Sequence, residues 1–570
     1  MNIVLLVRLM FFNLIHTRIR FIFVGVVIIL ALIIFKVFYI QVFQYEKLKT
    51  LSDSLYSRKL PIAADRGEII DRNGKVLATN ITTTSLVLIP RQITDKKKVA
   101  DALSKILGVT YEEMYKHVTK NESIERVHPE GRRLSYDIAK QIEDLGFDGV
   151  YLVKESKRYY PYNEMLSHVL GYVGIDNQGL SGLELKYDKY LTGENGSIKY
   201  FSDGKGNRLK LSEVYEPAAS GISLQLTIDV NIQMTVENEL DNIMSKYSPD
   251  NALIIVQDPN NGEILAMASR PAFDSNNYQN SSIEVINRNL PIWKTYEPGS
   301  TFKIITLAAS IEEKKFDLFK DTFHDSGAVN VDGATLHCWK HGGHGLQSFL
   351  QVVENSCNPG FVDMGLKLGT KTLMKYIKNF GFGKKTDIDL NGETKGILFK
   401  EEKMGLVETA TTAFGQGISV TPIQQITAVS AAINGGILYK PYIVKNLIEG
   451  ETKTVVDSNE KVIKKRVISK ETSSLVKYAL ESVVANGTGH NAYIENYRVG
   501  GKTGTAQKVV DGKYSASSYI LSFIGFLPAD DPKAVIYVAI DNAHNVTQYG
   551  GTASAPVAKN VMQSIINNMN

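Results

Sequence analysis

A serine and a lysine three residues apart form the first chemically suggestive pair in this sequence. Ser300 and Lys303 follow Pro298-Gly299 and precede an apolar run, a pattern that predicts the start of a buried helix. Residues three apart share one face of a helix, so the Lys303 amine could take the proton that Ser300 must lose to become a nucleophile. Burial would lower the pKa of this lysine and favour its neutral form. The pair therefore predicts nucleophilic serine chemistry.

Two further motifs distinguish this pair from chance occurrences of Ser-x-x-Lys. The same spacing recurs at three places that we interpret as surface, namely Ser202 with Lys205, Ser458 with Lys461, and Ser474 with Lys477. Only Ser300 is followed at wide spacing by Ser356-Cys357-Asn358 and then by Lys502-Thr503-Gly504-Thr505. This order is similar to that of the penicillin-recognising serine enzymes.

The second motif has the residue types that proton transfer needs. We expect Ser356 to relay a proton between Ser300, Lys303 and a leaving amine. The side-chain amide of Asn358 can hold Lys303 on one side and a substrate backbone carbonyl on the other.

The third motif suits the recognition of a carboxylate. Lys502 would present positive charge to it, and the hydroxyls of Thr503 and Thr505 would donate hydrogen bonds. Gly504 leaves room where the backbone must approach a ligand. We predict that the backbone N–H groups of Ser300 and Thr505 form an oxyanion hole, a device whose loss costs on the order of 10²- to 10³-fold in rate.

Cysteine and histidine side chains gather just before the second motif. Asp325, Cys338, His344 and Cys357 could form a tetrahedral zinc site, with His341 as a substitute ligand. The spacing matches no standard zinc finger. The alternative interpretation is that both cysteines are small buried side chains and that the histidines line a glycine-rich loop. Apart from this structural zinc, no cofactor is required.

Alternating and continuous apolar runs predict the elements that position these motifs. Asp229 is a predicted N-cap for a helix over 231–245. Pairs of apolar runs joined by turn residues predict hairpins, at 252–256 with 264–268 and at 519–526 with 534–540. A terminal helix is expected from Ala555. Helices between antiparallel hairpins indicate an α+β fold with a central antiparallel sheet flanked by helices.

The chain before this region predicts a mixed module without a nucleophile motif. Asn73-Gly74 is a hairpin turn signal, residues 95–148 read as mostly helical, and 197–211 as a strand. Because 570 residues exceed one hydrophobic core, several domains are expected. We predict a cytoplasmic N-terminus, an anchor, a non-catalytic pedestal and a catalytic domain, at 1–20, 21–43, 44–220 and 221–570.

The N-terminal segment determines the expected location. Residues 21–35 form an unbroken apolar run, and with 37–43 they reach membrane-spanning length. Arg8, Arg18 and Arg20 precede the run, which by the positive-inside rule leaves the N-terminus in the cytoplasm and the catalytic domain outside. A cleaved signal peptide is the competing interpretation, but no small-x-small cleavage site follows. A single-pass cell-membrane protein is expected.

The composition argues against a nucleic-acid partner and does not identify any other. The 64 basic and 60 acidic residues nearly balance, so no nucleic-acid partner is indicated. Two cysteines are too few for a disulfide framework.

Beyond the three motifs, several segments resemble those of one family, the class B penicillin-binding proteins. They are Arg66-Gly67-Glu68, Gly182-Leu183-Glu184, Tyr296-Glu297-Pro298-Gly299 and Gly415-Gln416-Gly417. The resemblance implies a peptidoglycan D,D-transpeptidase that is acylated by the D-Ala-D-Ala end of a stem peptide, releases D-alanine and transfers the acyl group to a neighbouring stem. It also implies covalent binding of β-lactam antibiotics, an elongated pedestal that docks partners, and a membrane glycosyltransferase as one of them.

Within this family the chain looks closest to the sporulation branch, because of the segments 338–345 and 353–362. Members of that branch often carry small C-terminal repeats, whereas this sequence ends at Asn570, so a division or elongation role stays open. Two rival functions also remain: a β-lactam hydrolase or sensor with the same motifs, and a scaffold that mainly activates a membrane glycosyltransferase.

Overall fold

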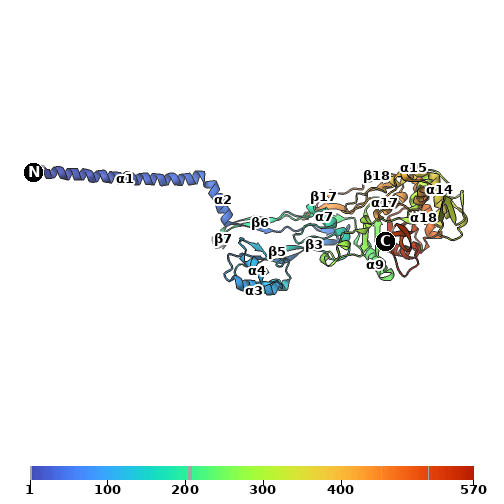
Figure 1. Cartoon of the computed structure of the whole chain (residues 1–570), viewed down its shortest axis with the longest axis horizontal. Coiled ribbons are helices and arrows are strands. Elements are labelled where there is room, and N and C mark those ends of the chain that lie inside the picture. Colours follow the sequence, from blue (N-terminus) through green and yellow to red (C-terminus); the bar gives the residue numbers. More distant parts are fainter. Residues whose placement is uncertain (1–2, 203–207, 451, 511, 570) are drawn as a thin grey trace. The chain divides into compact units, whose positions relative to one another are not determined.

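The computed structural model describes residues 3–202, 208–450, 452–510 and 512–569, and the chain forms two compact units (Figure 1). Unit 1 combines Met1–Ala63, Thr84–Lys154 and Asn195–Ala218. Unit 2 combines Ala64–Thr83, Glu155–Glu194 and Ala219–Asn570. Both units draw on segments that are distant in sequence, so the single boundary near Gly221 stays a prediction about independently folding domains.

Unit 1 begins with a long apolar helix, α1 (Ile3–Phe43), followed by α2 (Tyr45–Tyr56). Within the part of the chain that the structure describes, α1 is the one helix long and apolar enough to cross a membrane, and no residue of its most apolar window is buried. The predicted anchor at 21–43 lies inside it. A helix of 41 residues reaches about 60 Å at 1.5 Å per residue, roughly twice a bilayer core, so only part of α1 needs to span one.

The remainder of unit 1 contains a small helical core and a separate sheet. Three helices bury Val99, Leu103, Met114 and Ile142, and they are α3 (Lys96–Leu107), α4 (Tyr111–Thr119) and α5 (Tyr136–Asp144). The helical prediction for 95–148 is therefore confirmed. The sheet has the order β1-β6-β7, from β1 (Ser57–Ile62), β6 (Gly196–Ser202) and β7 (Arg208–Glu216). The strand predicted at 197–211 is divided between β6 and β7, and its residues 203–207 lie outside the described residues.

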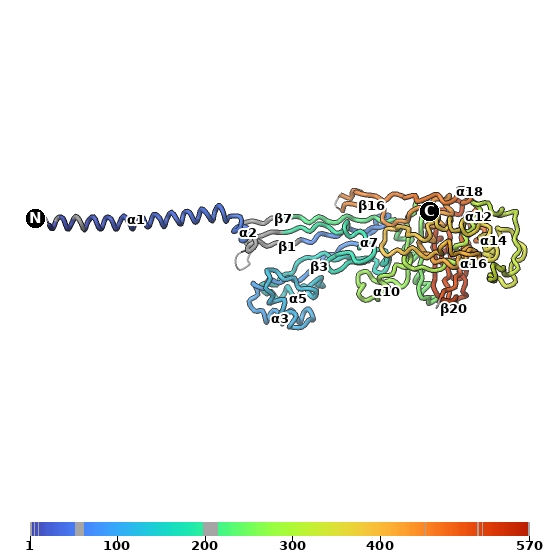
Figure 2. The backbone as a smooth tube through the Cα atoms, turned by 45° about the horizontal axis from the view of Figure 1, so that its top comes forward, coloured from blue at the N-terminus to red at the C-terminus, as the bar shows by residue number. Residues whose placement is uncertain are grey.

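A five-stranded antiparallel sheet organises unit 2. Its order is β10-β9-β21-β20-β19, formed by β9 (Asn251–Gln257), β10 (Ile264–Arg270), β19 (Gly500–Val510), β20 (Lys513–Leu527) and β21 (Ala534–Asp541). β9 pairs with β21, so two strands almost 300 residues apart in sequence are neighbours in one sheet, as in the pairing of Asn251 with Asp541. Figure 2 shows the same return, with the red C-terminal segment in the body that contains the green segments. Both hairpin predictions are confirmed, and β19 forms an edge.

Helices cover both faces of this sheet. On one face lie α9 (Val230–Tyr247) and α19 (Gly550–Met569), which bury Val236, Leu240, Val561 and Met562. Asp229 caps α9 as predicted, accepting from the N–H groups of Asn231 and Ile232. The terminal helix begins at Gly550, five residues before the predicted Ala555, since Gly550 and Gly551 already have helical backbone.

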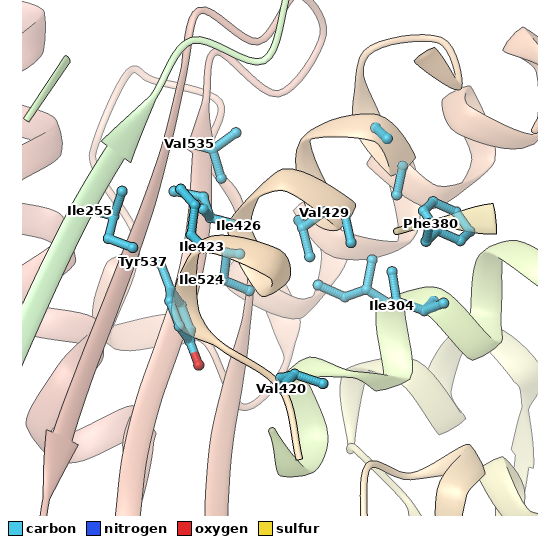
Figure 3. Close-up of a cluster of buried hydrophobic side chains, with 14 of the residues drawn as sticks. Ile255, Ile304, Phe380, Val420, Ile423, Ile426, Val429, Ile524, Val535 and Tyr537 are labelled. Atoms are coloured by element: carbon cyan, nitrogen blue, oxygen red, sulfur yellow. The ribbon is translucent and has the colours of Figure 1, made fainter. Parts of the chain in front are cut away.

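A second group of helices covers the other face. It comprises α12 (Lys303–Glu312), α14 (Asn358–Leu368), α17 (Pro422–Ile433) and α18 (Lys470–Asn486). Figure 3 shows Ile423 and Ile426 of α17 beside Ile255, Ile524 and Val535 of the sheet, with Val429 directed toward Ile304 of α12. Every residue of α17 is buried, so this helix is the core element between the sheet and α12.

A second sheet of unit 2 contains β2 (Ile69–Ile70), β8 (Ser223–Leu226), β16 (Val444–Ile448) and β17 (Val455–Ser458), with the first residues of β3 (Val76–Leu88). β2 and β3 are antiparallel neighbours across the turn at Gly74, whose φ is 86°. This pairing confirms the hairpin predicted at Asn73-Gly74. The left-handed backbone at the turn explains why glycine is suited to position 74.

Candidate active site

An open cleft of about 330 Å³ in unit 2 brings together the three sequence motifs. Its lining includes Ser300, Ser356, Asn358, Thr503 and Thr505. These residues come from separate parts of the chain and meet at the edge of the five-stranded sheet. The three motifs predicted to act together are therefore neighbours.

Ser300 lies on a short 3₁₀ turn, Gly299–Thr301, immediately before α12. Gly299 has a φ of 54°, and its N–H donates to the Gly415 carbonyl at 3.0 Å. A Cβ at Gly415 would lie 2.1 Å from the Gly299 carbonyl oxygen, which explains glycine there. The Thr301 hydroxyl donates to the Pro298 carbonyl at 2.8 Å and fixes the turn that presents Ser300.

Two buried lysines converge on Ser356. Lys303 Nζ lies 3.2 Å from Ser356 Oγ, 2.9 Å from the Ser356 carbonyl oxygen and 2.7 Å from Asn358 Oδ1. Lys502 Nζ donates to the same Ser356 Oγ at 2.8 Å and to the Thr503 carbonyl. Ser356 has a φ of 52°, a left-handed conformation that is uncommon for serine and places its hydroxyl between the two amines.

Burial changes the protonation of both amines. Lys303 is 1% exposed, and desolvation lowers its pKa to about 7. Desolvation, then the charge of Lys303, lowers the pKa of Lys502 well below its usual value. Neither ammonium has a carboxylate partner among the described residues, so the pair favours a neutral amine near neutral pH.

The third motif lies on β19, at the edge of the sheet. Thr503 and Thr505 face the cleft, whereas Lys502 is fully buried and does not line it. Lys502 therefore lies beside Ser356, behind the hydroxyls that we expect to meet a substrate carboxylate. A Cβ at Gly504 would approach Ser522 Oγ to 2.3 Å, so glycine there allows close packing inside the fold.

The structure adds cleft residues that the sequence reasoning did not single out as functional. They include Trp339, Phe414, Thr488, Asn491 and Tyr549. Trp339 and Tyr549 have ring centroids 6.3 Å apart, and both rings are about half exposed. Gln416 also lines the cleft and lies in the Gly-Gln-Gly segment quoted above. Lone aromatic residues carry no sequence signal, because their neighbours in the cleft come from distant segments.

The serines of two decoy pairs lie at the surface. Ser458 and Lys461 are exposed, and the Ser474 hydroxyl donates to the carbonyl of Lys470 in its own helix. The third decoy, Ser202 with Lys205, ends in residues outside the described ranges. The context used to select Ser300 thus separates it from the two decoys that the structure describes.

Four possible metal ligands meet beside the second motif. Ligand atoms of Asp325, Cys338, His344 and Cys357 lie within 4.8 Å of one another. His344 Nδ1 lies 2.8 Å from Asp325 Oδ2 and 3.5 Å from Cys338 Sγ. His341, the predicted substitute, is exposed and not part of this group. Two sulfurs, one imidazole and one carboxylate match the ligand chemistry and number that tetrahedral zinc prefers.

Packing around the third motif leads to a first prediction, for Gly550→Ala at the start of α19. The added Cβ would lie 2.3 Å from the carbonyl oxygens of both Gly504 and Ser522, which are backbone atoms in paired strands. We expect unfolding to require about 1–3 kcal/mol less free energy and penicillin acylation to slow, because β19 must shift. Thermal melts and acylation rates measure both effects. Gly450→Ala is the control, since its nearest atom is 3.7 Å away; equal behaviour of the two variants would contradict the prediction.

Comparison with known proteins finds two domain families that together match most of the chain. Residues 252–563 match the penicillin binding protein transpeptidase domain, and residues 61–226 match the penicillin-binding protein dimerisation domain. Stage V sporulation protein D of Bacillus subtilis is 54% identical over 550 residues, which cover 96% of this chain and 85% of the relative. Peptidoglycan D,D-transpeptidase FtsI of Escherichia coli K12 is 29% identical over 561 residues, covering 96% and 90%.

A solved structure extends the similarity to the fold. Penicillin Binding Protein 2X from Streptococcus thermophilus superposes with a TM-score of 0.73 at 26% identity, covering 90% of this chain and 80% of that one. The sheet, the serine at the helix start and the matched domains define a penicillin-recognising serine transpeptidase fold. The chain belongs to the class B penicillin-binding proteins.

Proposed function

We propose that this protein is a peptidoglycan D,D-transpeptidase that acts through an acyl-enzyme on Ser300. The observation that carries the proposal is the convergence of Lys303 and Lys502 on Ser356 Oγ, at the cleft that Ser300 lines. The similarity to a sporulation protein and to a named D,D-transpeptidase supports a role in spore or septal wall synthesis.

The first half-reaction forms the acyl-enzyme. Neutral Lys303 accepts the Ser300 proton as Oγ attacks the penultimate D-alanine carbonyl of a stem peptide. The bond from that carbonyl to the nitrogen of the terminal D-alanine breaks, and a proton relayed by Ser356 converts the leaving group to an amine. We assign the oxyanion to the backbone N–H groups of Ser300 and Thr505, and the terminal carboxylate to the hydroxyls of Thr503 and Thr505.

The second half-reaction transfers the acyl group. The amine of a neighbouring stem attacks the ester carbonyl, a new amide forms, and the proton returns to Ser300 as its bond to the acyl group breaks. Asn358 holds Lys303 through Oδ1, and its Nδ2 donates to the His337 carbonyl at 3.1 Å, which fixes the amide orientation. A β-lactam would form the first ester and remain there.

Labelling with a fluorescent penicillin, followed by peptide mapping, tests this function. We expect one adduct, on Ser300, and none in Ser300→Ala. Labelling elsewhere, or none in folded protein, would refute the assignment. Rapid turnover of the adduct would favour the β-lactam hydrolase, and full complementation in cells by Ser300→Ala would favour the scaffold.

We further propose that α1 is an uncleaved membrane anchor with its N-terminus in the cytoplasm. Arg8, Arg18 and Arg20 lie on the N-terminal half of the helix, which supports this orientation by the positive-inside rule. The catalytic domain would then be extracytoplasmic, with residues 44–220 as a pedestal. A membrane glycosyltransferase as partner of this pedestal rests on the family resemblance and can be tested by co-purification.

A zinc ion at Asp325, Cys338, His344 and Cys357 is the third proposal. Cys357 lies between Ser356 and Asn358, so a bound ion would fix the backbone that carries both residues. We expect chelator-free protein to contain about one zinc per chain, and Cys338→Ser to lose it and melt at a lower temperature. Elemental analysis and thermal melts measure these outcomes. His341→Ala is the control and should keep the metal; protein without stoichiometric zinc would disprove the proposal.

A further inference from the structure

A second cavity in unit 2, of about 460 Å³, is rimmed by positive charge. It lies between the end of α15 (Thr370–Asn379), the start of α17, β15 (Ile437–Tyr439) and β18 (Ile463–Arg466). None of the cleft residues named above lines it. Its lining includes five lysines and one carboxylate, that of Asp387, so it attracts anions; the lysines are Lys378, Lys384, Lys385, Lys464 and Lys465.

Two of the lysines are partly neutralised and three are not. Lys464 Nζ pairs with Asp387 at 2.7 Å, and Lys378 Nζ lies 3.3 Å from Glu401. Lys465 Nζ donates at 2.7 Å to the neutral side chain of Asn379. Among the described residues, no carboxylate lies within ion-pair distance of Lys384, Lys385 or Lys465. Three positive charges therefore remain available around one cavity.

Part of the rim is held in place before any ligand arrives. Lys464 Nζ also donates to the Thr386 carbonyl at 2.8 Å, and Lys465 is fixed by Asn379. A lysine ammonium has three donors, so both can still donate to an oxyanion. Fixing a long side chain beforehand reduces the entropy that ligand binding must overcome.

Part of the remaining lining is apolar, beside the polar side chains of Asn379, Thr386 and Gln424. Leu438, Tyr439 and Pro441 offer a surface for carbon atoms, and Phe380 extends from the cavity into the core that Figure 3 shows. The cavity has the size of a site for a small organic ligand. A ligand with several oxyanions and an organic skeleton fits these features better than an inorganic ion does.

We propose that this cavity is a second binding site for the carboxylate-bearing stem peptides of the cell wall. The proposal rests on the proposed function, which brings the catalytic domain to a polymer whose peptides carry several carboxylates. The three unpaired lysines bind those carboxylates, and the apolar part of the lining contacts the side chains. The site retains a wall strand while the cleft acts on its peptides.

Direct binding to the full-length protein in detergent tests the proposal. The cleft is first blocked by acylation with benzylpenicillin, and a wall-type stem pentapeptide with free carboxylates is then titrated by calorimetry. We expect saturable binding that salt weakens and that the methyl-esterified peptide lacks. Absence of saturable binding would overturn the proposal. If penicillin fails to label Ser300, the proposed function fails, and the cavity variants described next then show whether the peptide binds at this cavity.

Two sets of variants locate the binding. The double variant Lys384→Glu with Lys385→Glu should weaken peptide binding at least about tenfold. The control is Lys314→Glu with Lys315→Glu, two exposed lysines that are consecutive in sequence and lie outside the cavity lining, and it should leave the affinity unchanged. Equal loss in both double variants would overturn the site.

A glycerol-phosphate oligomer is the final probe: if it binds and the peptide does not, the stem-peptide assignment is wrong.

Discussion

Replacing Lys303 with alanine is expected to slow penicillin acylation of Ser300 by about 10²- to 10⁴-fold, the usual contribution of a general base. The Lys303 amine is buried, has a lowered pKa and contacts Ser356 and Asn358. Lys502 shares the burial, the lowered pKa and the contact with Ser356, but only Lys303 follows Ser300 by three residues. Lys303→Met fills the same space without an amine and should be equally slow, which separates chemistry from packing. Lys461→Ala, in the exposed decoy, should acylate normally.

The pH dependence of acylation tests the same base. Lys303 must be neutral to accept a proton, and burial lowers its pKa to about 7. The wild-type acylation rate should therefore rise with pH, reach half its maximum near pH 7 and level off above it. In Lys303→Met the slow residual rate should lack this step. A wild-type rate that falls as pH rises through 7 would show that the lysine does not act as the base.

The meeting of the three motifs at one cleft could be predicted because each motif consists of a few adjacent residues. The pairing of Ser300 with Lys303, expected from helical periodicity, stays a prediction, since the hydrogen bonds of Lys303 are with Ser356 and Asn358. The position of Lys502 could not be predicted in the same way. Its expected contact was a substrate carboxylate, whereas the fold buries its amine against Ser356, a contact between residues 146 positions apart.

The fold shows a similar division between local and distant information. Hairpins and the α9 cap follow from turn residues and short apolar runs, so both could be predicted. The pairing of β9 with β21, and the membership of Ala64–Thr83 and Glu155–Glu194 in the catalytic unit, depend on contacts between distant segments. The cavity beside Lys384 likewise has no motif, since its lysines come from separate elements.

Glu184 provides the second large expected effect, this time on stability. Its carboxylate is fully buried in unit 2 and accepts from Arg66 Nε at 2.6 Å and from Arg158 Nε at 2.7 Å. Tyr160 donates to the same carboxylate at 3.2 Å. Arg66 also pairs with Asp188, whereas Glu184 is the one carboxylate within ion-pair distance of Arg158 in the described part of the chain. The two segments that resembled family motifs, at Arg66 and Glu184, are thus partners in one ionic network.

Glu184→Ala should lower the free energy of unfolding of this unit by about 3–5 kcal/mol, because it leaves two guanidinium groups buried with fewer partners. The control is Glu284→Ala, which removes an exposed ion pair with Arg288 and should lower the free energy of unfolding by at most about 0.5 kcal/mol. Thermal and urea unfolding of both variants measure the difference.

Penicillin acylation, measured well below the unfolding transition, should be nearly unchanged in Glu184→Ala, since no residue of this ionic network lines the cleft. A variant that melts like the wild type would show that the buried carboxylate contributes little, and one that is stable but slow to acylate would place Glu184 in catalysis instead.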